Sequence, residues 1–153
     1  MTLTEVLKHT SPALFISELQ ATNKKAVLDE LVAGLIAGTP ITNRETILKM
    51  LKSREQLGST AVGPGLAFPH GRTLAVQQLT ILIARSRKGL DFDSIDGGKT
   101  HLFFVLIAPP HDSGNQYIRS LAVLTEKLQA TELRDRLMAA KDYEGFCLAL
   151  QEA

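Results

Sequence analysis

Apolar residues recur at helical spacing in the first third of the chain. They lie three or four residues apart, as the buried stripe of an amphipathic helix requires, at Val27, Leu28, Leu31, Val32, Leu35 and Ile36. Thr22 or Asn23 can cap the start of this helix, and Gly38 together with Pro40 ends it. The pattern therefore predicts one long helix in this part of the chain.

A second helix is predicted immediately afterwards. Thr42 is followed three residues later by Glu45, which is the spacing of a capping box at a helix start. The buried stripe continues through Ile47, Leu48, Met50 and Leu51. The helix is expected to reach about Arg54, so that the two helices form a hairpin.

The middle of the chain changes to the composition of loops and strands. Residues 56–65 are rich in Gly, Ser, Thr and Pro, and they lead into a short apolar run at residues 66–68 that stops at the following Pro-His-Gly. Residues 79–84 and 101–108 are β-branched, aromatic or otherwise apolar, which is typical of strands covered on both faces. Residues 96–98 between them predict a tight turn.

The last third returns to helical spacing. One apolar stripe contains Ile118, Leu121, Ala122, Leu124, Thr125 and Leu128, and two shorter ones contain Leu133, Leu137, Phe146, Leu148 and Leu150. Helices, then strands, then helices predict an α/β (α+β) fold in which a central mixed β-sheet is flanked by helices. No linker or repeat divides the sequence, so residues 1–153 are expected to form a single domain.

Composition narrows the classes of protein to consider. Apolar residues make up 44% of the 153 residues and charged residues 22%, as in a globular domain. The formal net charge of +1 gives no electrostatic footprint for nucleic acid. The apolar stretch 102–110 is too short to cross a membrane, and the first 17 residues do not resemble a secretion signal. With Cys147 as the only cysteine, these features favour the cytoplasm.

Among the four histidines, His70 stands out as a candidate for chemistry near neutral pH. It follows the apolar run, and it is flanked by Pro69, which fixes its own backbone angle, and by Gly71, which removes side-chain bulk. We expect this imidazole to point outward from a rigid scaffold, with room for another protein to approach. The other three histidines lie where solvated or structural roles are expected.

The loop upstream of His70 carries groups that suit a phosphate dianion. It offers the guanidinium of Arg54, the hydroxyls of Ser59 and Thr60, and several glycine amides. No Gly-Lys-Ser or Gly-Lys-Thr occurs, so the loop is not a P-loop and a nucleotide is not expected. No His-x-His, His-Glu-x-x-His or clustered carboxylate pattern indicates a metal site.

This segment resembles the signature of a known family. The matching residues are Arg54-Glu55, Leu57-Gly58-Ser59-Thr60, Gly63 and Gly65-Leu66-Ala67-Phe68-Pro69-His70-Gly71-Arg72. They are similar to the type-2 enzyme IIA domains of the bacterial phosphotransferase system, which include fructose-specific, mannitol-specific and nitrogen-regulatory forms. The similarity continues in order through residues 91–97, residues 108–109 and the helix that begins near Asn115, and so covers nearly the whole chain.

The resemblance implies a role for each matching residue. His70 matches the family's phosphorylated histidine, which accepts the phosphoryl group from a histidine of the small carrier protein HPr or a relative. Arg54 matches an arginine near that site, and Ser59 and Thr60 match the hydroxyls beside it. The chain would be a phosphotransferase component that passes the group to a IIB domain or regulates other proteins by its phosphorylation state. No metal, nucleotide or other cofactor is implied.

The sequence departs from the family pattern at one position. Members usually carry a second histidine at the start of the helix after the Ala-Pro loop, and Tyr117 occupies this place here. A tyrosine hydroxyl can donate a hydrogen bond to phosphate, but it supplies no positive charge near pH 7. His111 could substitute if its loop folds back. Alternatively, Tyr117 is an ordinary amphipathic residue at the helix start.

Three functions remain open from the sequence. The first is a phosphocarrier, for which the Gly-Ser-Thr loop and the lack of a fused IIB segment favour the nitrogen-regulatory branch. The second is a non-catalytic regulatory binding module whose phosphotransfer is impaired because Tyr117 replaces the second histidine. The third is a metal-dependent hydrolase that uses His70 with aspartates, and the missing metal-ligand spacing disfavours it.

Overall fold

Two long strands account for the most apolar part of the sequence. β4 (Thr80–Leu90) and β5 (Thr100–Ala108) pair antiparallel in the computed structural model, which describes residues 1–153. The predicted strand at 101–108 is confirmed. The strand expected at residues 79–84 is longer than expected and runs to Leu90. The apolar pattern ends at Ala84 in the sequence, but Arg85 and Ser86, although polar, are also buried within the strand.

Three short strands complete the five-stranded sheet. They are β1 (Phe15–Ile16), β2 (Leu66–Ala67) and β3 (His70–Arg72). β1 pairs with β4, and β2 and β3 both pair with β5, all in parallel. Pro69 has no N–H to donate and separates β2 from β3. The sequence predicted that the apolar run at residues 66–68 stops at Pro69. In the structure the chain pairs with β5 again from His70 onward, so β2 and β3 together form one interrupted edge of the sheet.

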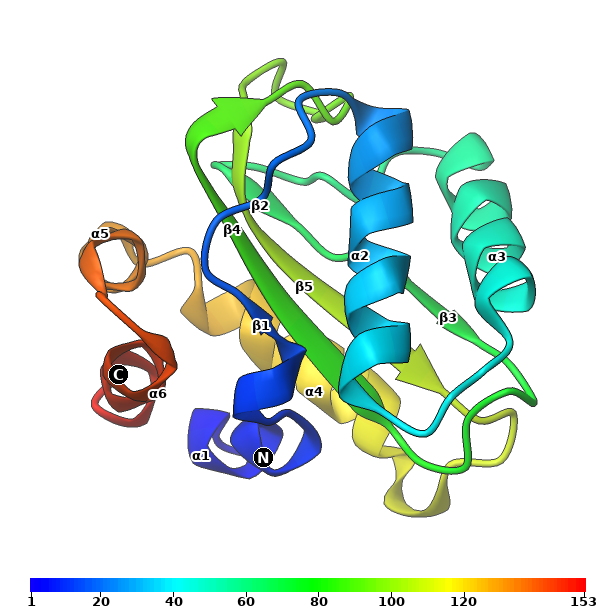
Figure 1. The fold of residues 1–153 in the computed structure, drawn as a ribbon. Coiled ribbons are helices and arrows are strands. Elements are labelled where there is room, and N and C mark those ends of the chain that lie inside the picture. Colours follow the sequence, from blue (N-terminus) through cyan, green and yellow to red (C-terminus); the bar gives the residue numbers. More distant parts are fainter.

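Helices cover both faces of the sheet (Figure 1). One layer consists of α2 (Lys24–Gly38) and α3 (Arg44–Gln56). The other contains α1 (Leu3–Val6), α4 (Gln116–Lys127), α5 (Thr131–Ala139) and α6 (Tyr143–Gln151). Short 3-10 turns lie at Leu7–His9, Pro12–Leu14 and Ser113–Asn115. The predicted mixed sheet between helices is therefore confirmed, and none of the helices combines the length and hydrophobicity that crossing a bilayer requires.

Strand alternation divides the core into two clusters. Ile81 and Ile83 pack with the layer of α4, whereas Leu82 and Ala84 between them pack with α2 and α3. Successive side chains of a strand point to opposite faces, so each long strand contributes to both clusters.

The helix starts test the predicted caps. The side chain of Asn23 accepts the Ala26 N–H at 2.9 Å and caps α2, as expected. The capping box predicted from Thr42 is wrong, because α3 begins one residue too late for it and has no side-chain cap. The capping box in this chain instead joins Thr2 and Glu5 at the start of α1.

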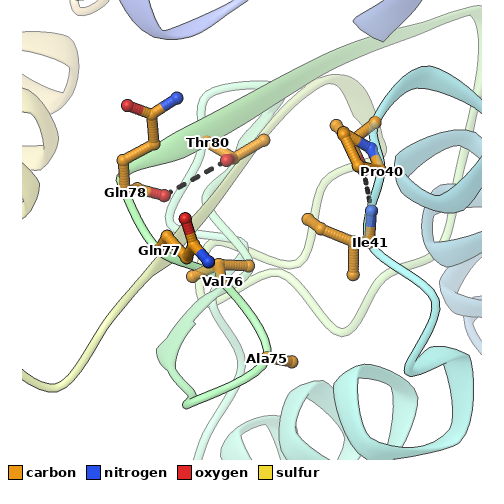
Figure 2. A pocket seen from close by; sticks show the side chains of 8 residues that line it. Pro40, Ile41, Ala75, Val76, Gln77, Gln78 and Thr80 are labelled. Carbon is orange, nitrogen blue, oxygen red and sulfur yellow. Dashed lines mark hydrogen bonds between the residues drawn. The ribbon is translucent and has the colours of Figure 1, made fainter.

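A surface hollow of about 500 Å³ lies where the end of α2 meets the segment after β3 (Figure 2). Pro40 and Ile41 form one side, and Ala75, Val76 and Gln77 form the other. Its lining contains hydroxyls and carboxamides but no ionisable side chain. The hollow therefore offers no ionisable acid or base.

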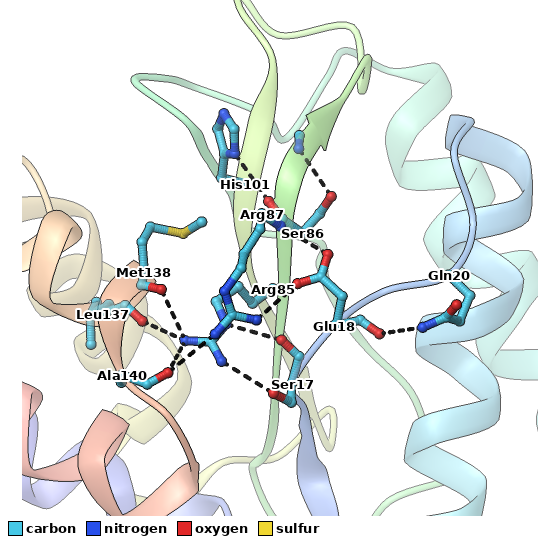
Figure 3. Close-up of polar contacts among 11 residues, drawn as sticks. Ser17, Glu18, Gln20, Arg85, Ser86, Arg87, His101, Leu137, Met138 and Ala140 are labelled. Carbon is cyan, nitrogen blue, oxygen red and sulfur yellow. Dashed lines mark hydrogen bonds and ion pairs between the residues drawn. The ribbon is translucent and has the colours of Figure 1, made fainter.

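A buried arginine ties the C-terminal helices to the sheet (Figure 3). Arg85 is fully buried, and its Nη1 donates to the carbonyls of Leu137 at 2.8 Å and Ala140 at 2.7 Å, while its Nε donates to Ser17 O at 3.0 Å. Carbonyls at a helix end lack intrahelical donors and carry partial negative charge. Burial, and then the like charge of Arg87, lower the pKa of this guanidinium. Arg85 thus replaces the missing donors at the end of α5.

Candidate functional site

His70 lies where the core face of the edge strands reaches the surface. Leu66 and Phe68 are buried in the cluster beneath α4, and the half-buried His70 follows them on the same face. Gly71 faces the opposite way, toward α3. A Cβ at that position would lie 2.7 Å from the sulfur of Met50. The missing side chain therefore permits packing of α3.

A backbone hydrogen bond fixes the tautomer of His70. Its Nδ1 lies 2.6 Å from the carbonyl oxygen of Phe68. A carbonyl can only accept a hydrogen bond, so Nδ1 carries the proton in the neutral ring and Nε2 carries the lone pair. Nε2 has no hydrogen-bond partner in the protein. The ring is thus held with its nucleophilic nitrogen unoccupied.

The start of α4 brings Tyr117 beside this ring. The carboxylate of Asp112 accepts the N–H of Tyr117, in the first turn of α4, at 2.7 Å. The ring centroids of Tyr117 and His70 are 6.1 Å apart, with an interplanar angle of 51°. Arg72 lies over the same tyrosine, with Cζ 4.7 Å from the ring centroid, and its Nη1 donates to Pro109 O at 3.1 Å. The four elements β3, β5, α4 and the loop between β5 and α4 therefore meet at His70.

Two guanidinium groups act on the phenol of Tyr117. Burial raises its pKa, and the positive charges of Arg72 and, to a smaller extent, Arg54 oppose this rise. The phenol is therefore neutral near pH 7. Arg54 lies in the last turn of α3, where its Nη1 donates to Gly58 O at 2.8 Å. Of the predicted site residues, Tyr117 lies beside His70, and the charge of Arg54 reaches the phenol of Tyr117.

The hydroxyls of Ser59 and Thr60 are engaged within the loop. Ser59 Oγ donates to Phe92 O at 2.9 Å and accepts the Ala61 N–H at 3.1 Å. Thr60 is buried, and its hydroxyl donates to the carboxylate of Glu55. Neither hydroxyl proton is free for a phosphate in this arrangement. Both residues instead stabilise the loop that follows Arg54.

Glu55 joins this loop to two helices. Its side chain is only 5% exposed, and it accepts the Thr60 N–H at 3.1 Å in addition to the Thr60 hydroxyl. Lys24 of α2 forms an ion pair with it at 3.0 Å and lies 4.7 Å from the ring centroid of Phe92. The only sequence signal that Glu55 holds this loop was its place next to Arg54 in the family signature.

Arg72 is the other residue that sequence reasoning missed. It belongs to the family signature but received no role. A strand places residues two apart on the same face, so recognition of β3 as a strand would have paired Arg72 with His70.

His111 is exposed and makes no hydrogen bond or ring contact with His70 or its neighbours. The structure therefore does not bring this candidate into the site. His101 has the structural role expected of it, since its Nδ1 lies 3.0 Å from Ser86 O. No group of three or more His, Cys, Asp or Glu side chains is arranged to hold a metal ion.

Known proteins resemble this chain in sequence over most of its length. Residues 8–153 match the family described as phosphoenolpyruvate-dependent sugar phosphotransferase system, EIIA 2. A nitrogen regulatory protein of Bradyrhizobium diazoefficiens is 33% identical over 135 residues, which cover 88% of this chain and 87% of the relative. The fructose-specific EIIABC component of Bacillus subtilis is 32% identical over 146 residues, 95% of this chain, and the match spans only 22% of that longer protein.

Solved structures share the fold. The nitrogen regulatory protein IIA-Ntr from Neisseria meningitidis has a TM-score of 0.86 and 26% identity, with 95% of this chain and 99% of that chain covered. The Escherichia coli enzyme IIA mannitol, in its complex with phosphorylated enzyme IIB mannitol, has a TM-score of 0.76 at 18% identity and shows a common fold, with 94% and 97% covered. As the Gly-Ser-Thr to Pro-His-Gly signature predicted, the chain belongs to the EIIA type-2 family of the phosphotransferase system, whose members are phosphotransfer components.

Proposed function

We propose that this chain is a phosphocarrier whose acceptor atom is Nε2 of His70. The proposed donor is the phosphohistidine of an HPr-like carrier protein. One observation carries the proposal: Nδ1 of His70 donates to the Phe68 carbonyl, and Nε2 is therefore left with its lone pair and without a protein partner. A neutral imidazole nitrogen of this kind is a competent nucleophile for phosphoryl transfer.

Transfer to this atom requires no general base. The Nε2 lone pair forms a new nitrogen–phosphorus bond while the nitrogen–phosphorus bond of the donor breaks. The Nδ1 proton stays in its hydrogen bond, where the carbonyl of Phe68 stabilises the positive charge that the ring gains. The same bond would hold the ring in place when the group is handed on.

Arg54 is the proposed ligand of the incoming phosphoryl oxygens. Only its Nη1 is engaged, by Gly58 O, and no carboxylate pairs with it. Its other N–H groups can therefore donate to the equatorial oxygens in the transition state. Ser59 and Thr60 are proposed to act indirectly, by holding the loop that fixes Arg54.

The proposed output is regulatory. The likeness to nitrogen regulatory proteins over most of their length supports this branch. A IIB domain is the alternative acceptor, supported by the solved pair of IIA mannitol with phosphorylated IIB mannitol. We propose the cytoplasm as the place of action, since the donor must be met there and the single cysteine is free.

The test is a labelling experiment with phosphoenolpyruvate, HPr and the kinase that phosphorylates HPr. The wild-type chain is expected to acquire an acid-labile phosphate that maps to His70. His70→Gln should remove the label without lowering the free energy of unfolding, and Arg54→Gln should slow labelling by about tenfold or more. His111→Gln is the matched comparison and should keep the label, because that ring is exposed and makes no contact with the site.

A binding module with impaired phosphotransfer is the second candidate. Tyr117 favours it, because a buried neutral phenol supplies no charge at the place where the family pattern has a second histidine. If no label reaches His70 while the chain still binds HPr, the module replaces the phosphocarrier. A label on another histidine would refute the choice of His70.

A further inference from the structure

Arg72 is a second cation beside His70. The two residues are two apart in β3, so their side chains leave the same face of the strand about 6.6 Å apart. Arg72 is exposed at the end of the strand, whereas His70 is half-buried. A doubly negative phosphoryl group on Nε2 of His70 would therefore stand within reach of this guanidinium.

Tyr117 fills the space between the two side chains. Its ring centroid lies 6.1 Å from that of His70 and 4.7 Å from Cζ of Arg72. The ring cannot move freely, because the side chain is 5% exposed and Asp112 caps its backbone N–H. A guanidinium over such a ring face is held by cation–π attraction. Tyr117 thus provides a fixed support for Arg72.

Arg72 also has free donors and no negative partner. One N–H of Arg72 is engaged by Pro109 O at 3.1 Å, and the others have no acceptor in the protein. Neither Arg72 nor Arg54 forms an ion pair with a carboxylate, so the charge of each is available to an anion. An unpaired guanidinium close to the imidazole favours binding of an anion there.

We propose that Arg72 binds the oxygens of the phosphoryl group on His70 as a second cation beside Arg54, and that the ring face of Tyr117, rather than its hydroxyl, holds it there. This inference rests on the proposed function of His70. It assigns Arg72 as a phosphate-binding residue and Tyr117 as a positioning residue. The positive charge that a tyrosine cannot supply is thereby supplied by the arginine stacked upon it.

The test uses phosphoramidate, which phosphorylates histidine without a protein donor. Its phosphorus–nitrogen bond breaks and ammonia leaves, while Nε2 of His70 forms the new nitrogen–phosphorus bond and Nδ1 keeps its proton. Phosphohistidine at His70 and at the exposed His111 is followed in the intact chain by phosphorus NMR and peptide mapping. His70 is expected to react faster than His111, which serves as the reference within each sample.

Four variants divide the roles. Arg72→Gln should slow phosphorylation of His70 by about tenfold. This effect is smaller than that of removing a fully buried hydrogen-bond donor, because Arg72 is exposed. Arg72→Lys should recover part of the rate. Arg44→Gln removes the same charge at the far end of α3 and is the control. Tyr117→Leu should slow the reaction about threefold, as loss of a cation–π contact allows, whereas Tyr117→Phe should slow it no more than about twofold.

The double variant Arg72→Gln/Tyr117→Leu should be no slower than Arg72→Gln alone, because Tyr117 acts through Arg72. Equal rates for Arg72→Gln and Arg44→Gln would overturn the inference and leave His70 as the acceptor. An equal loss in Tyr117→Phe and Tyr117→Leu would assign the effect to the hydroxyl instead, because both variants lack it and only Tyr117→Phe keeps the ring. If wild-type His70 is phosphorylated no faster than His111, the proposed function fails together with the inference.

Discussion

Glu55 is the residue at which the stability of the loop before His70 can be tested most directly. The change Glu55→Ala removes a carboxylate that accepts the N–H and the hydroxyl of Thr60 and pairs with Lys24 at 3.0 Å. Thr60 is 3% exposed, so water does not readily replace the lost acceptor. Lys24 is affected less, because it is partly exposed and also lies 3.4 Å from Asp93.

The expected loss follows from these contacts. Each buried donor left without a partner costs about 1–3 kcal/mol, and Thr60 contributes two. The remaining partner of Lys24 keeps the ion-pair contribution below about 1 kcal/mol. The free energy of unfolding should therefore fall by about 2–7 kcal/mol, a large part of the 5–15 kcal/mol that is roughly typical of a domain.

Urea unfolding followed by circular dichroism measures this loss, and hydrogen exchange locates it. The amides of the loop after Arg54 should exchange faster in Glu55→Ala, while those of β4 and β5 change only as much as the global stability does. Glu45→Ala is the matched control, because Glu45 is exposed in the first turn of the same helix and should cost about 0.5 kcal/mol. A loss in Glu55→Ala no larger than in this control would refute the reasoning.

Two further predictions concern stability. Arg85→Met removes the guanidinium donor from the carbonyls of Ser17, Leu137 and Ala140 and should lower the free energy of unfolding by about 3–5 kcal/mol in urea titrations. The exposed Arg87→Met should cost no more than about 1 kcal/mol, and equal losses in the two variants would contradict the role of the buried guanidinium. Burial lowers the pKa of His9 below its ordinary value of 6.5, so the unfolded chain binds this proton first and stability is lost as the pH falls below about 6.5. His9→Gln should flatten the dependence of the urea midpoint on pH between about 7 and 5, and parallel curves for the two proteins would contradict this.

Much of this protein could be inferred from local sequence. The sequence correctly predicted the helix α2, its cap at Asn23 and the strand at 101–108. The helix and the strand could be predicted because the spacing of apolar residues shows whether an element is buried on one face or on both. The family was identified from the Gly-Ser-Thr to Pro-His-Gly segment, and the comparisons confirm it. By contrast, β1 and β3 are too short to show a period, and Thr42 has the composition of a capping box without its geometry.

The sequence by itself determined the layers of the fold, the family and the choice of His70 as the residue to test. Only the tertiary structure decided what surrounds that residue: which ring nitrogen is free, that Arg72 and Tyr117 stack beside it, and that Glu55 rather than a phosphate receives the hydroxyl of Thr60. The physical reason is that these contacts join segments far apart in the chain. Their geometry depends on the register of β3 against β5 and on where α4 begins, which no local pattern of residues encodes.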